Sequence, residues 1–335
     1  MDLSTRYLGL SLAHPIVASA SPLTATIDGV RRIEDAGASA VVMSSLYEEQ
    51  IRAEDTAYAL YTDHGSNSNP EAGSYFPSLP EYDRGRSGRL ETLRKTVESV
   101  RIPVIASVSC VTLEGWVEYA ALAEQAGAAA LELSVLMLAD DVEESGAHIE
   151  HRYVDIVRAV KSAVTIPVAV KLSPFVSSLG HLAKQLVGAG ADGLVLFNRF
   201  YEPDVDLNSL SLRSELTLGA RHEIRLPLLW ISLLSGRLPV SFAASRGVET
   251  STEVVKYLLV GADVVMTTSA LLRYGPMHLG ELRQGLESWL DAHGHDSLEG
   301  LRGRLRAATP EHVDEVLRGH HTRLLRDYLP KHLRL

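Results

Sequence analysis

The strongest constraint on the fold is a pair of short patterns that alternate along the chain. One is a proline that opens an apolar stretch ending in serine, at 14–21, 103–109, 167–173 and 239–245. The other is a Gly-Ala pair followed by a second apolar stretch, at 36–45, 126–134, 189–198 and 261–269. From each proline to the next such glycine the separations are 22, 24, 23 and 22 residues. This regularity predicts one structural unit that is used four times.

Each repeat contains the parts of strand–helix units. The apolar stretches are rich in Val, Ile and Ala without polar alternation, as in parallel strands that are buried on both faces. Between them lie segments such as TIDGVRRIEDAG, whose apolar residues recur at helical spacing and whose glycine ends the helix. Eight strands between residues 14 and 269 match the ~250 residues of a (β/α)8 barrel. We therefore predict an α/β chain with the TIM-barrel fold, and an open doubly wound sheet is the competing architecture.

The connections from each glycine to the next proline are less even, at 66, 40 and 49 residues. Extra chain is therefore expected after the second, fourth and sixth strands, at 46–88, 135–148 and 199–236. Because the loops that follow the strands form the catalytic face of this fold, these three segments are predicted to cover the active site.

The chain is predicted to divide into two parts. Residues 1–300 form the barrel, and residues 301–335 form a short helical extension that packs on its outside. The extension is rich in Lys and Arg, which favours solvated helix faces, and a basic surface for a partner is the alternative.

Composition excludes several classes of function. The formal charge of -10 argues against a protein that mainly binds nucleic-acid phosphates. A single cysteine, Cys110, excludes an intramolecular disulfide and a cysteine-ligated metal cluster, as in a reducing compartment. No signal peptide and no apolar run of ~18 residues is present in the sequence. We predict a cytoplasmic enzyme with a small-molecule substrate, without nucleic acid or membrane as a partner.

Polar residues stand where the predicted strands end, which is the mouth of such a barrel. They are Ser19, Ser21, Ser44, Ser45, Ser109, Ser134, Lys171, Ser173, Asn198, Ser245, Thr267, Thr268 and Ser269. Lys171 is the most informative, because a lysine within an apolar strand must reach the mouth or lose its hydration. It could point an ammonium group at an electron-rich ring or form a Schiff base as a neutral amine.

A phosphate site is predicted after strands seven and eight. Barrels of this kind often bind phosphate there, with backbone N–H groups at helix starts. Ser245-Arg246-Gly247 and Thr267-Thr268-Ser269 supply hydroxyls, backbone N–H groups and a guanidinium in these places. The alternative is that they only cap the following helices.

Three other patterns suggest binding or catalytic sites, but their sequence context does not support such sites. Gly188, Gly190 and Gly193 spell G-x-G-x-x-G, but they follow a helix and enter a strand, which reverses the dinucleotide fingerprint. Two histidine pairs, at 148 and 151 and at 320 and 321, have no carboxylate ligands at a fitting spacing, so no metal site is predicted. Cys110 ends the third strand, where a lone cysteine is usually a small buried apolar residue.

In their order and spacing, several segments resemble the dihydroorotate dehydrogenase family, in particular its soluble branch. They are LAHPIVASAS, AVVMSSLYEEQ, GSNSNPEAG, ALELS, PVAVKLSP, LFNRF, SRGVET and TTSALLRYG, within residues 3 to 290. The resemblance implies FMN at the barrel mouth and a homodimer. The residues assigned to the cofactor are Ser19, Ala20, Ser21, Ser44, Ser45, Lys171, Asn198, Ser245, Arg246, Gly247, Thr267, Thr268 and Ser269. Asn67, Ser134 and Asn198 are assigned to the substrate.

Departures from the family pattern concern the reaction. The family has an asparagine-x-serine-cysteine-proline run after strand four, whose cysteine is the catalytic base, whereas this chain has Glu132-Leu133-Ser134-Val135-Leu136. Ser44 stands nearest to a family lysine at the end of strand two. Glu132 could replace the base, with acidic residues at 140–144 as alternatives, or it could form an ion pair with Lys171.

The sequence thus favours an FMN-dependent oxidoreductase of the CH–CH class, in which Lys171 and Glu132 are the candidate catalytic residues. Hydride passes between a substrate carbon and the flavin, and the substrate is expected to differ from dihydroorotate. Pyrimidine metabolism is the family's setting. Two alternatives are a flavin-binding homologue without dehydrogenase activity and a lyase or aldolase barrel that uses Lys171 as a Schiff base.

Overall fold

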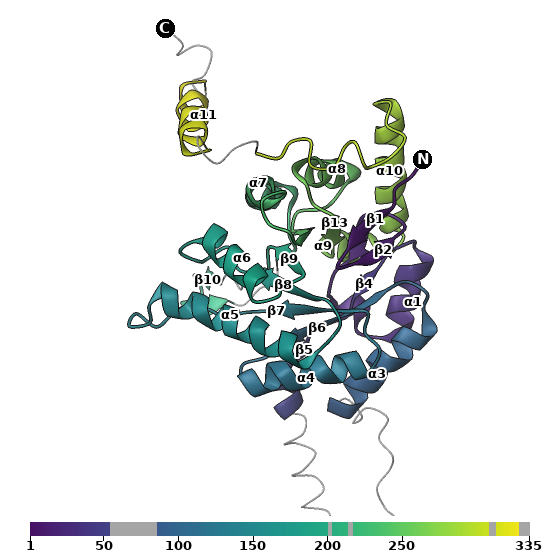
Figure 1. Cartoon of the computed structure of the whole chain (residues 1–335), viewed down its shortest axis with the longest axis vertical. Helices are drawn as coiled ribbons and strands as arrows, with labels where there is room; N and C mark the ends of the chain where they lie inside the picture. Colours follow the sequence, from purple (N-terminus) through teal and green to yellow (C-terminus); the bar gives the residue numbers. More distant parts are fainter. Residues whose placement is uncertain (54–85, 200–202, 214–216, 308–312, 328–335) are drawn as a thin grey trace, which may run out of the picture.

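A computed structural model describes residues 1–53, 86–199, 203–213, 217–307 and 313–327. Within these ranges, parallel strands surround a common axis and helices lie outside them (Figure 1). The barrel strands are β3 (Ile16–Ala18), β4 (Val41–Val42), β6 (Val104–Ser109), β7 (Ala130–Ser134), β8 (Val168–Leu172), β9 (Gly193–Leu196), β12 (Ser241–Ser245) and β13 (Val264–Thr267). Pairing of β13 with β3, and of β4 with both β3 and β6, closes the sheet. The predicted (β/α)8 barrel is confirmed.

The two sequence patterns correspond to alternate strands of this barrel. The proline pattern opens β3, β6, β8 and β12, and the Gly-Ala pattern precedes β4, β7, β9 and β13. The repeated glycine recurs because the chain leaves each preceding helix through a left-handed conformation that costs glycine little. Gly37, Gly127, Gly190 and Gly261 have φ of +88°, +91°, +106° and +106°.

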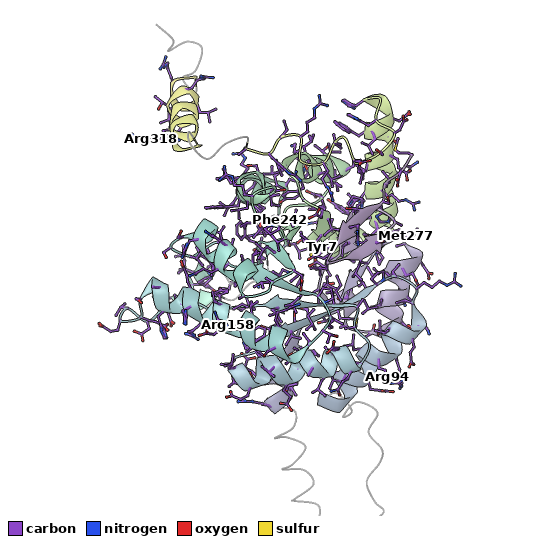
Figure 2. All side chains as sticks on the ribbon, viewed as in Figure 1. Tyr7, Arg94, Arg158, Phe242, Met277 and Arg318 are labelled. Carbon is purple, nitrogen blue, oxygen red and sulfur yellow. The ribbon has the colours of Figure 1, made fainter. Side chains whose placement is uncertain are left out.

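The outer layer consists of helices that follow the barrel strands. They are α1 (Ile27–Asp35), α3 (Arg86–Ser99), α4 (Leu113–Gln125), α5 (Gly146–Ala163), α6 (Leu179–Gly188), α7 (Arg225–Leu234), α8 (Ser251–Val260), α9 (Ser269–Tyr274) and α10 (His278–Ala292). The side chains of Thr26, Thr112 and Ser145 accept a backbone N–H in the first turn of α1, α4 and α5, which fixes where these helices begin. Figure 2 shows Arg94 and Arg158 on outward faces of this layer.

Side chains of the strands alternate between two apolar layers. Leu131 and Leu133 of β7 pack outward against the helices, whereas Ala130 belongs to a smaller cluster inside the barrel. Glu132 and Ser134 share the inward face with Ala130, because successive residues of a strand point to opposite sides. The inner face is therefore apolar at its amino end and polar towards the mouth.

A short hairpin, β1 (Thr5–Tyr7) and β2 (Leu10–Leu12), closes the amino end of the barrel. Tyr7 and Leu8 belong to the inner cluster, and both are almost fully buried. A Cβ at Gly193 would lie 2.5 Å from Cδ2 of Leu8, so any side chain at the start of β9 would displace the Leu8 side chain from its place against the strand.

Two of the predicted long connections contain further elements. In 46–88, β5 (Leu46–Tyr47) pairs with the end of β6, and α3 begins at Arg86. In 199–236, a hairpin of β10 (Asp204–Asp206) and β11 (Ser211–Arg213) precedes the 3-10 turn η2 (Arg221–Ile224). The latter connection also holds α7, a regular helix of the outer layer, so less of it is loop than the spacing predicted.

The chain beyond α10 lies first against the barrel helices. Leu305 and Ala307 donate backbone hydrogen bonds to Leu259 and Ser232, and Arg302 pairs with Asp263 at 2.6 Å. A further helix, α11 (Val313–Asp327), follows. Packing of the whole extension 301–335 on the outside of the barrel 1–300 stays a prediction.

Candidate active site

A cavity of about 670 Å³ lies at the carboxyl ends of the barrel strands, where the sequence predicted the mouth. Its lining comes from the segments that follow β3, β8, β9, β12 and β13, which are far apart in the chain. The predicted cofactor residues that line it are Ser19, Ala20, Ser21, Lys171, Asn198, Ser245, Arg246, Gly247, Thr267, Thr268 and Ser269. The closed barrel thus brings together all of the predicted cofactor residues except Ser44 and Ser45.

Lys171 and Glu132 form a buried ion pair beside this cavity. Nζ of Lys171 lies 3.1 Å from Oε1 of Glu132 and 3.4 Å from the hydroxyl of Ser19. Glu132 is only 1% exposed and does not line the cavity, whereas Lys171 does. Because a buried carboxylate needs a counter-charge, this arrangement favours a charged ammonium at the mouth and the ion-pair interpretation of Glu132.

Asn198 is held in one orientation by its neighbours. Its amide Nδ2 donates to Oγ of Ser134 at 3.0 Å, and its Oδ1 accepts the backbone N–H of Arg199 at 2.9 Å. Ser134 itself does not line the cavity. Of the two, only Asn198 is therefore placed to contact a ligand, and Ser134 orients it.

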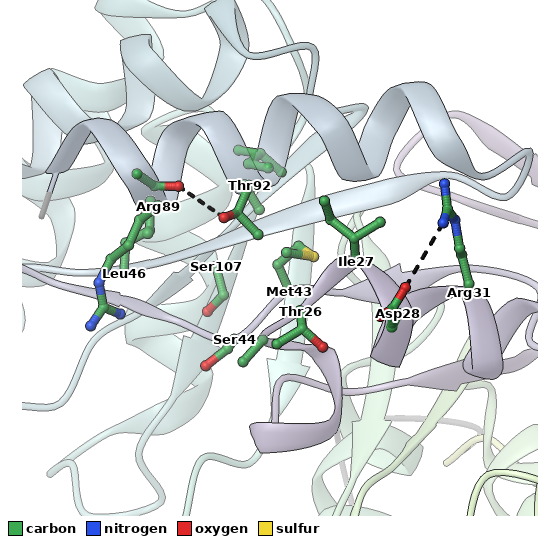
Figure 3. A pocket seen from close by; sticks show the side chains of 14 residues that line it. Thr26, Ile27, Asp28, Arg31, Met43, Ser44, Leu46, Arg89, Thr92 and Ser107 are labelled. Atoms are coloured by element: carbon green, nitrogen blue, oxygen red, sulfur yellow. Dashed lines mark hydrogen bonds and ion pairs between the residues drawn. The ribbon is translucent and has the colours of Figure 1, made fainter. Parts of the chain in front are cut away.

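Ser44 and Ser45 lie away from the cavity at the mouth. Oγ of Ser45 is 2.8 Å from Oγ of Ser107, and both side chains are buried. Ser44 lines a second cavity of about 660 Å³, bordered by Thr26, Met43 and Ser107 (Figure 3). The chain departs from the sheet between β4 and β5, which turns these serines away from the other predicted cofactor residues. Asn67 lies outside the described residues.

The turn at Arg246 has an unusual backbone. Arg246 has φ of +90°, a conformation that costs a residue with a side chain free energy and that occurs most often at functional sites. The hydroxyl of Tyr257 donates to the Arg246 carbonyl at 2.8 Å, and burial raises the pKa of that hydroxyl, so it donates as a neutral phenol. Nε of Arg246 donates to Oε2 of Glu223 at 3.1 Å. The guanidinium predicted for phosphate is thus paired with a carboxylate.

Several lining residues were not predicted from the sequence. They are Pro22, Tyr47, Phe197, Arg199, Thr217, Leu218, Gly219, Glu223, Val248, Met266 and Leu272. Arg199 directly follows the predicted Asn198, so its position in LFNRF was an available signal. Tyr47 and Phe197 likewise lie within the quoted segments AVVMSSLYEEQ and LFNRF, whereas Thr217, Leu218, Gly219 and Glu223 come from the connection at 199–236, where no motif marks them.

Comparison with known proteins finds relatives that match most of the chain. No protein-family model matches the sequence. The catalytic subunit of dihydroorotate dehydrogenase B (NAD(+)) from Thermoplasma volcanium is 24% identical over 308 residues, which cover 90% of this chain and 98% of that protein. The same subunit from Desulforamulus reducens is 26% identical over 259 residues, or 71% and 84% of the two chains. The chain is dihydroorotate dehydrogenase-like.

A second group of relatives widens the comparison. The NAD-dependent dihydropyrimidine dehydrogenase subunit PreA from Escherichia coli is 24% identical over 334 residues, which cover 90% of this chain and 76% of that protein. The similarity of this dihydroorotate dehydrogenase-like chain therefore extends across dehydrogenases with different named substrates. Among the described residues, no helix has the length and apolarity that would allow it to cross a membrane.

In this dihydroorotate dehydrogenase-like chain, neither Val135 nor Cys110 brings a base to the cavity. Val135 is fully buried and packs outward against the helices, as Leu131 and Leu133 on the same face of the strand do. Cys110 does not line the cavity, and burial raises the pKa of its thiol well above the usual range. The one cysteine of the chain is thus neither placed nor ionised as a proton acceptor.

Proposed function

We propose that this chain is an FMN-dependent oxidoreductase that moves a hydride between a carbon of a small substrate and the flavin. The oxidoreductase class follows from the relatives, which are named as dehydrogenases. The observation that supports FMN as the cofactor is the cavity at the mouth, because all of the residues predicted for FMN except Ser44 and Ser45 line it together, Asn198 and Lys171 among them. Its volume of about 670 Å³ lies within the usual range for a site of this kind.

The lining fits the two chemically different ends of FMN. Ser19, Ala20 and Ser21 with Lys171 and Asn198 would hold the ring, to which they offer hydroxyls, an amide and a cation. The turns at 245–247 and 267–269 would hold the phosphate through hydroxyls and backbone N–H groups. When bound, FMN supplies the chemistry of accepting and donating hydride.

The chain's own residues orient and neutralise charge in this proposal. Glu132 holds the Lys171 ammonium towards the cavity, and Ser134 holds the Asn198 amide. A fixed cation at the mouth favours negative charge that develops beside it, without reorganisation of solvent. We assign Lys171 the electrostatic role and Glu132 the role of a positioning residue.

The lyase alternative requires a neutral amine at Lys171. The ion pair with Glu132 at 3.1 Å stabilises the ammonium form instead, which is a poor nucleophile. The geometry therefore supports the oxidoreductase over a Schiff-base enzyme. The same cavity would serve a flavin-binding homologue without turnover, which the experiment below distinguishes.

We propose a substrate other than dihydroorotate. Repulsion of an anionic substrate by Glu132 is not the reason, because Lys171 compensates that carboxylate and the carboxylate does not line the cavity. The remaining reason is the missing thiol, because neither Cys110 nor the residue at position 135 can take a proton from a substrate there.

The first test is the absorption spectrum of the purified protein, with the released pigment identified by chromatography and mass spectrometry. We expect bound FMN in the purified protein or stoichiometric uptake of added FMN. Anaerobic addition of dihydroorotate, a dihydropyrimidine and other reduced candidates then asks which of them bleaches the flavin. A protein that neither contains nor binds FMN overturns the proposal, and a flavoprotein that no candidate reduces favours the homologue without turnover.

A further inference from the structure

Among the residues that the structure describes, two guanidinium groups line the cavity at the mouth, and their surroundings differ. Arg246 is paired with Glu223, whose Oε2 accepts Nε at 3.1 Å, and both side chains are less than one-fifth exposed. Oε1 of Glu223 in turn accepts the backbone N–H of Ala220 at 2.9 Å. Arg246 is thus compensated and fixed against η2.

Arg199 stands in contrast to Arg246. Within the part of the chain that the structure describes, its guanidinium has no carboxylate or carbonyl partner, and its backbone N–H is the group that bonds to Asn198. Lys171 is balanced by Glu132, and Arg246 by Glu223. Of the described cations that line the cavity, Arg199 is therefore the one that forms no ion pair.

Gly219 shows where the Arg199 guanidinium lies. A Cβ added at Gly219 would be 3.3 Å from Oγ of Ser269 and 3.6 Å from both Nη1 of Arg199 and Oε1 of Glu223. The backbone N–H of Gly219 donates to the same Ser269 oxygen at 3.0 Å. The space left by the absent side chain is therefore bordered by the Arg199 guanidinium, the Ser269 hydroxyl and the Glu223 carboxylate that pairs with Arg246, on one wall of the cavity beside the 267–269 turn.

We propose that Arg199, together with Ser269, binds the phosphate monoester of the flavin, while Arg246 shapes the wall through Glu223. The inference rests on the proposed FMN function. A guanidinium binds phosphate oxygens through two parallel N–H donors, which makes such contacts stronger than neutral hydrogen bonds. A dianion at this end of the cavity needs a cation that is not already in an ion pair, and Arg199 supplies it.

The test compares FMN with riboflavin, which lacks the phosphate. Apoprotein is titrated with each flavin, and binding is followed by quenching of flavin fluorescence. In the parent chain we expect FMN to bind more tightly than riboflavin. Arg199→Gln is expected to weaken FMN binding about 10- to 100-fold and to change riboflavin binding less than about threefold.

Two further variants separate this assignment from other effects. Arg158→Gln removes an exposed arginine on α5, and it is expected to leave the affinity for both flavins unchanged. The double variant Glu223→Gln with Arg246→Gln removes both charges of the compensated pair, so its loss of FMN affinity is expected to be smaller than that of Arg199→Gln. Thermal unfolding of each apoprotein checks that the variants fold.

Three results overturn the inference. The first is an unchanged FMN affinity in Arg199→Gln. If an anionic substrate then reduces the flavin of that variant more slowly, the arginine is assigned to the substrate. The second is an equal loss of affinity for FMN and for riboflavin in Arg199→Gln, because a phosphate contact affects the binding of FMN alone. Equal affinity of the parent for the two flavins overturns the phosphate contact but leaves the flavoprotein, whereas a parent that binds neither flavin overturns the proposed function itself.

Discussion

Lys171 on β8 and Glu132 on β7 are joined across 3.1 Å inside the barrel, and the carboxylate is 1% exposed. The two residues are 39 positions apart in the chain. The second oxygen of Glu132 has no partner among the described residues, so Lys171 carries most of the stabilisation of this charge. This dependence makes the pair sensitive to substitution on either side.

Substitution of one partner is expected to destabilise the fold. Lys171→Gln leaves a buried carboxylate without its counter-charge, which costs roughly 3 kcal/mol of unfolding free energy. The double variant Lys171→Gln with Glu132→Gln is expected to recover most of this loss, because no charge remains to be compensated. Urea denaturation of the parent, both single variants and the double variant gives the comparison. A double variant no more stable than Lys171→Gln would show that the pair is not coupled as described.

The reduction potential of the bound flavin tests the electrostatic role of Lys171. Lys171→Gln is expected to lower the potential, because the ammonium favours negative charge on the reduced ring. Glu132→Gln is expected to raise it, because the ammonium then lacks its compensating charge. Spectroelectrochemical titration measures both. An unchanged potential in both variants would place the flavin away from Lys171.

Flavin retention tests the phosphate end of the cavity. Ser269→Ala removes a hydroxyl that lies next to the Gly219 N–H and lines the cavity. We expect this variant to lose FMN during dialysis that the parent withstands. The flavin-to-protein ratio after dialysis is the measurement, and full retention in both Ser269→Ala and Arg246→Ala would show that the phosphate has been misplaced.

Dihydroorotate is expected to reduce the flavin at a negligible rate, since no thiol base faces the cavity. Val135→Cys is not expected to raise this rate, because the side chain at 135 packs in the outer layer. Anaerobic stopped-flow absorbance measures flavin reduction in the parent and in the variant. Rapid reduction of the parent would contradict the proposal, and rapid reduction of the variant alone would contradict the placement of residue 135.

Glu48 gives a pH-dependent prediction about stability. Burial by itself would raise the pKa of this carboxyl, but hydrogen bonds from Thr112 and Val111 and the charge of Arg52 outweigh it and hold the pKa below its usual value. The ionised group therefore contributes stability above the unfolded pKa of about 4.3, and this contribution is lost as the pH falls through the lower folded pKa.

The corresponding variant is Glu48→Gln, measured by urea denaturation between pH 7 and pH 3. We expect the parent to be more stable at pH 7 and the difference to shrink as the solution becomes acidic. A difference that stays constant over this range would show that ionisation of Glu48 does not stabilise the fold.

The buried hydroxyl of Tyr7 can be removed without an expected loss of unfolding free energy. The hydroxyl is buried inside the barrel and has no partner among the described residues. Tyr7→Phe removes a buried polar group without removing a hydrogen bond, so the variant is expected to be at least as stable as the parent. A clear loss of unfolding free energy would instead show that an ordered water bonds to this hydroxyl.

Local pattern was sufficient to predict the barrel and its mouth. Proline can open a strand, continuous apolar stretches suit strands buried on both sides, and glycine permits the left-handed exit of a helix. These preferences depend on residues close in sequence, so they can be recognised without knowledge of the tertiary structure. Once the barrel is assumed, the carboxyl ends of its strands must meet, which is why most of the predicted cofactor residues line one cavity.

Tertiary structure alone decided which partner each of these residues has. Arg246 pairs with Glu223, and Arg199 lies near Ser269 beside Gly219. Both contacts depend on where the 199–236 connection brings these segments in space. Ser44 turned to the second cavity because the chain leaves the sheet after β4. Val135 faces the helices because a shift of one residue along a strand changes the side to which a side chain points. Residue type and spacing therefore determined where polar groups gather, whereas distances between distant segments determined which charges remain free to bind a ligand.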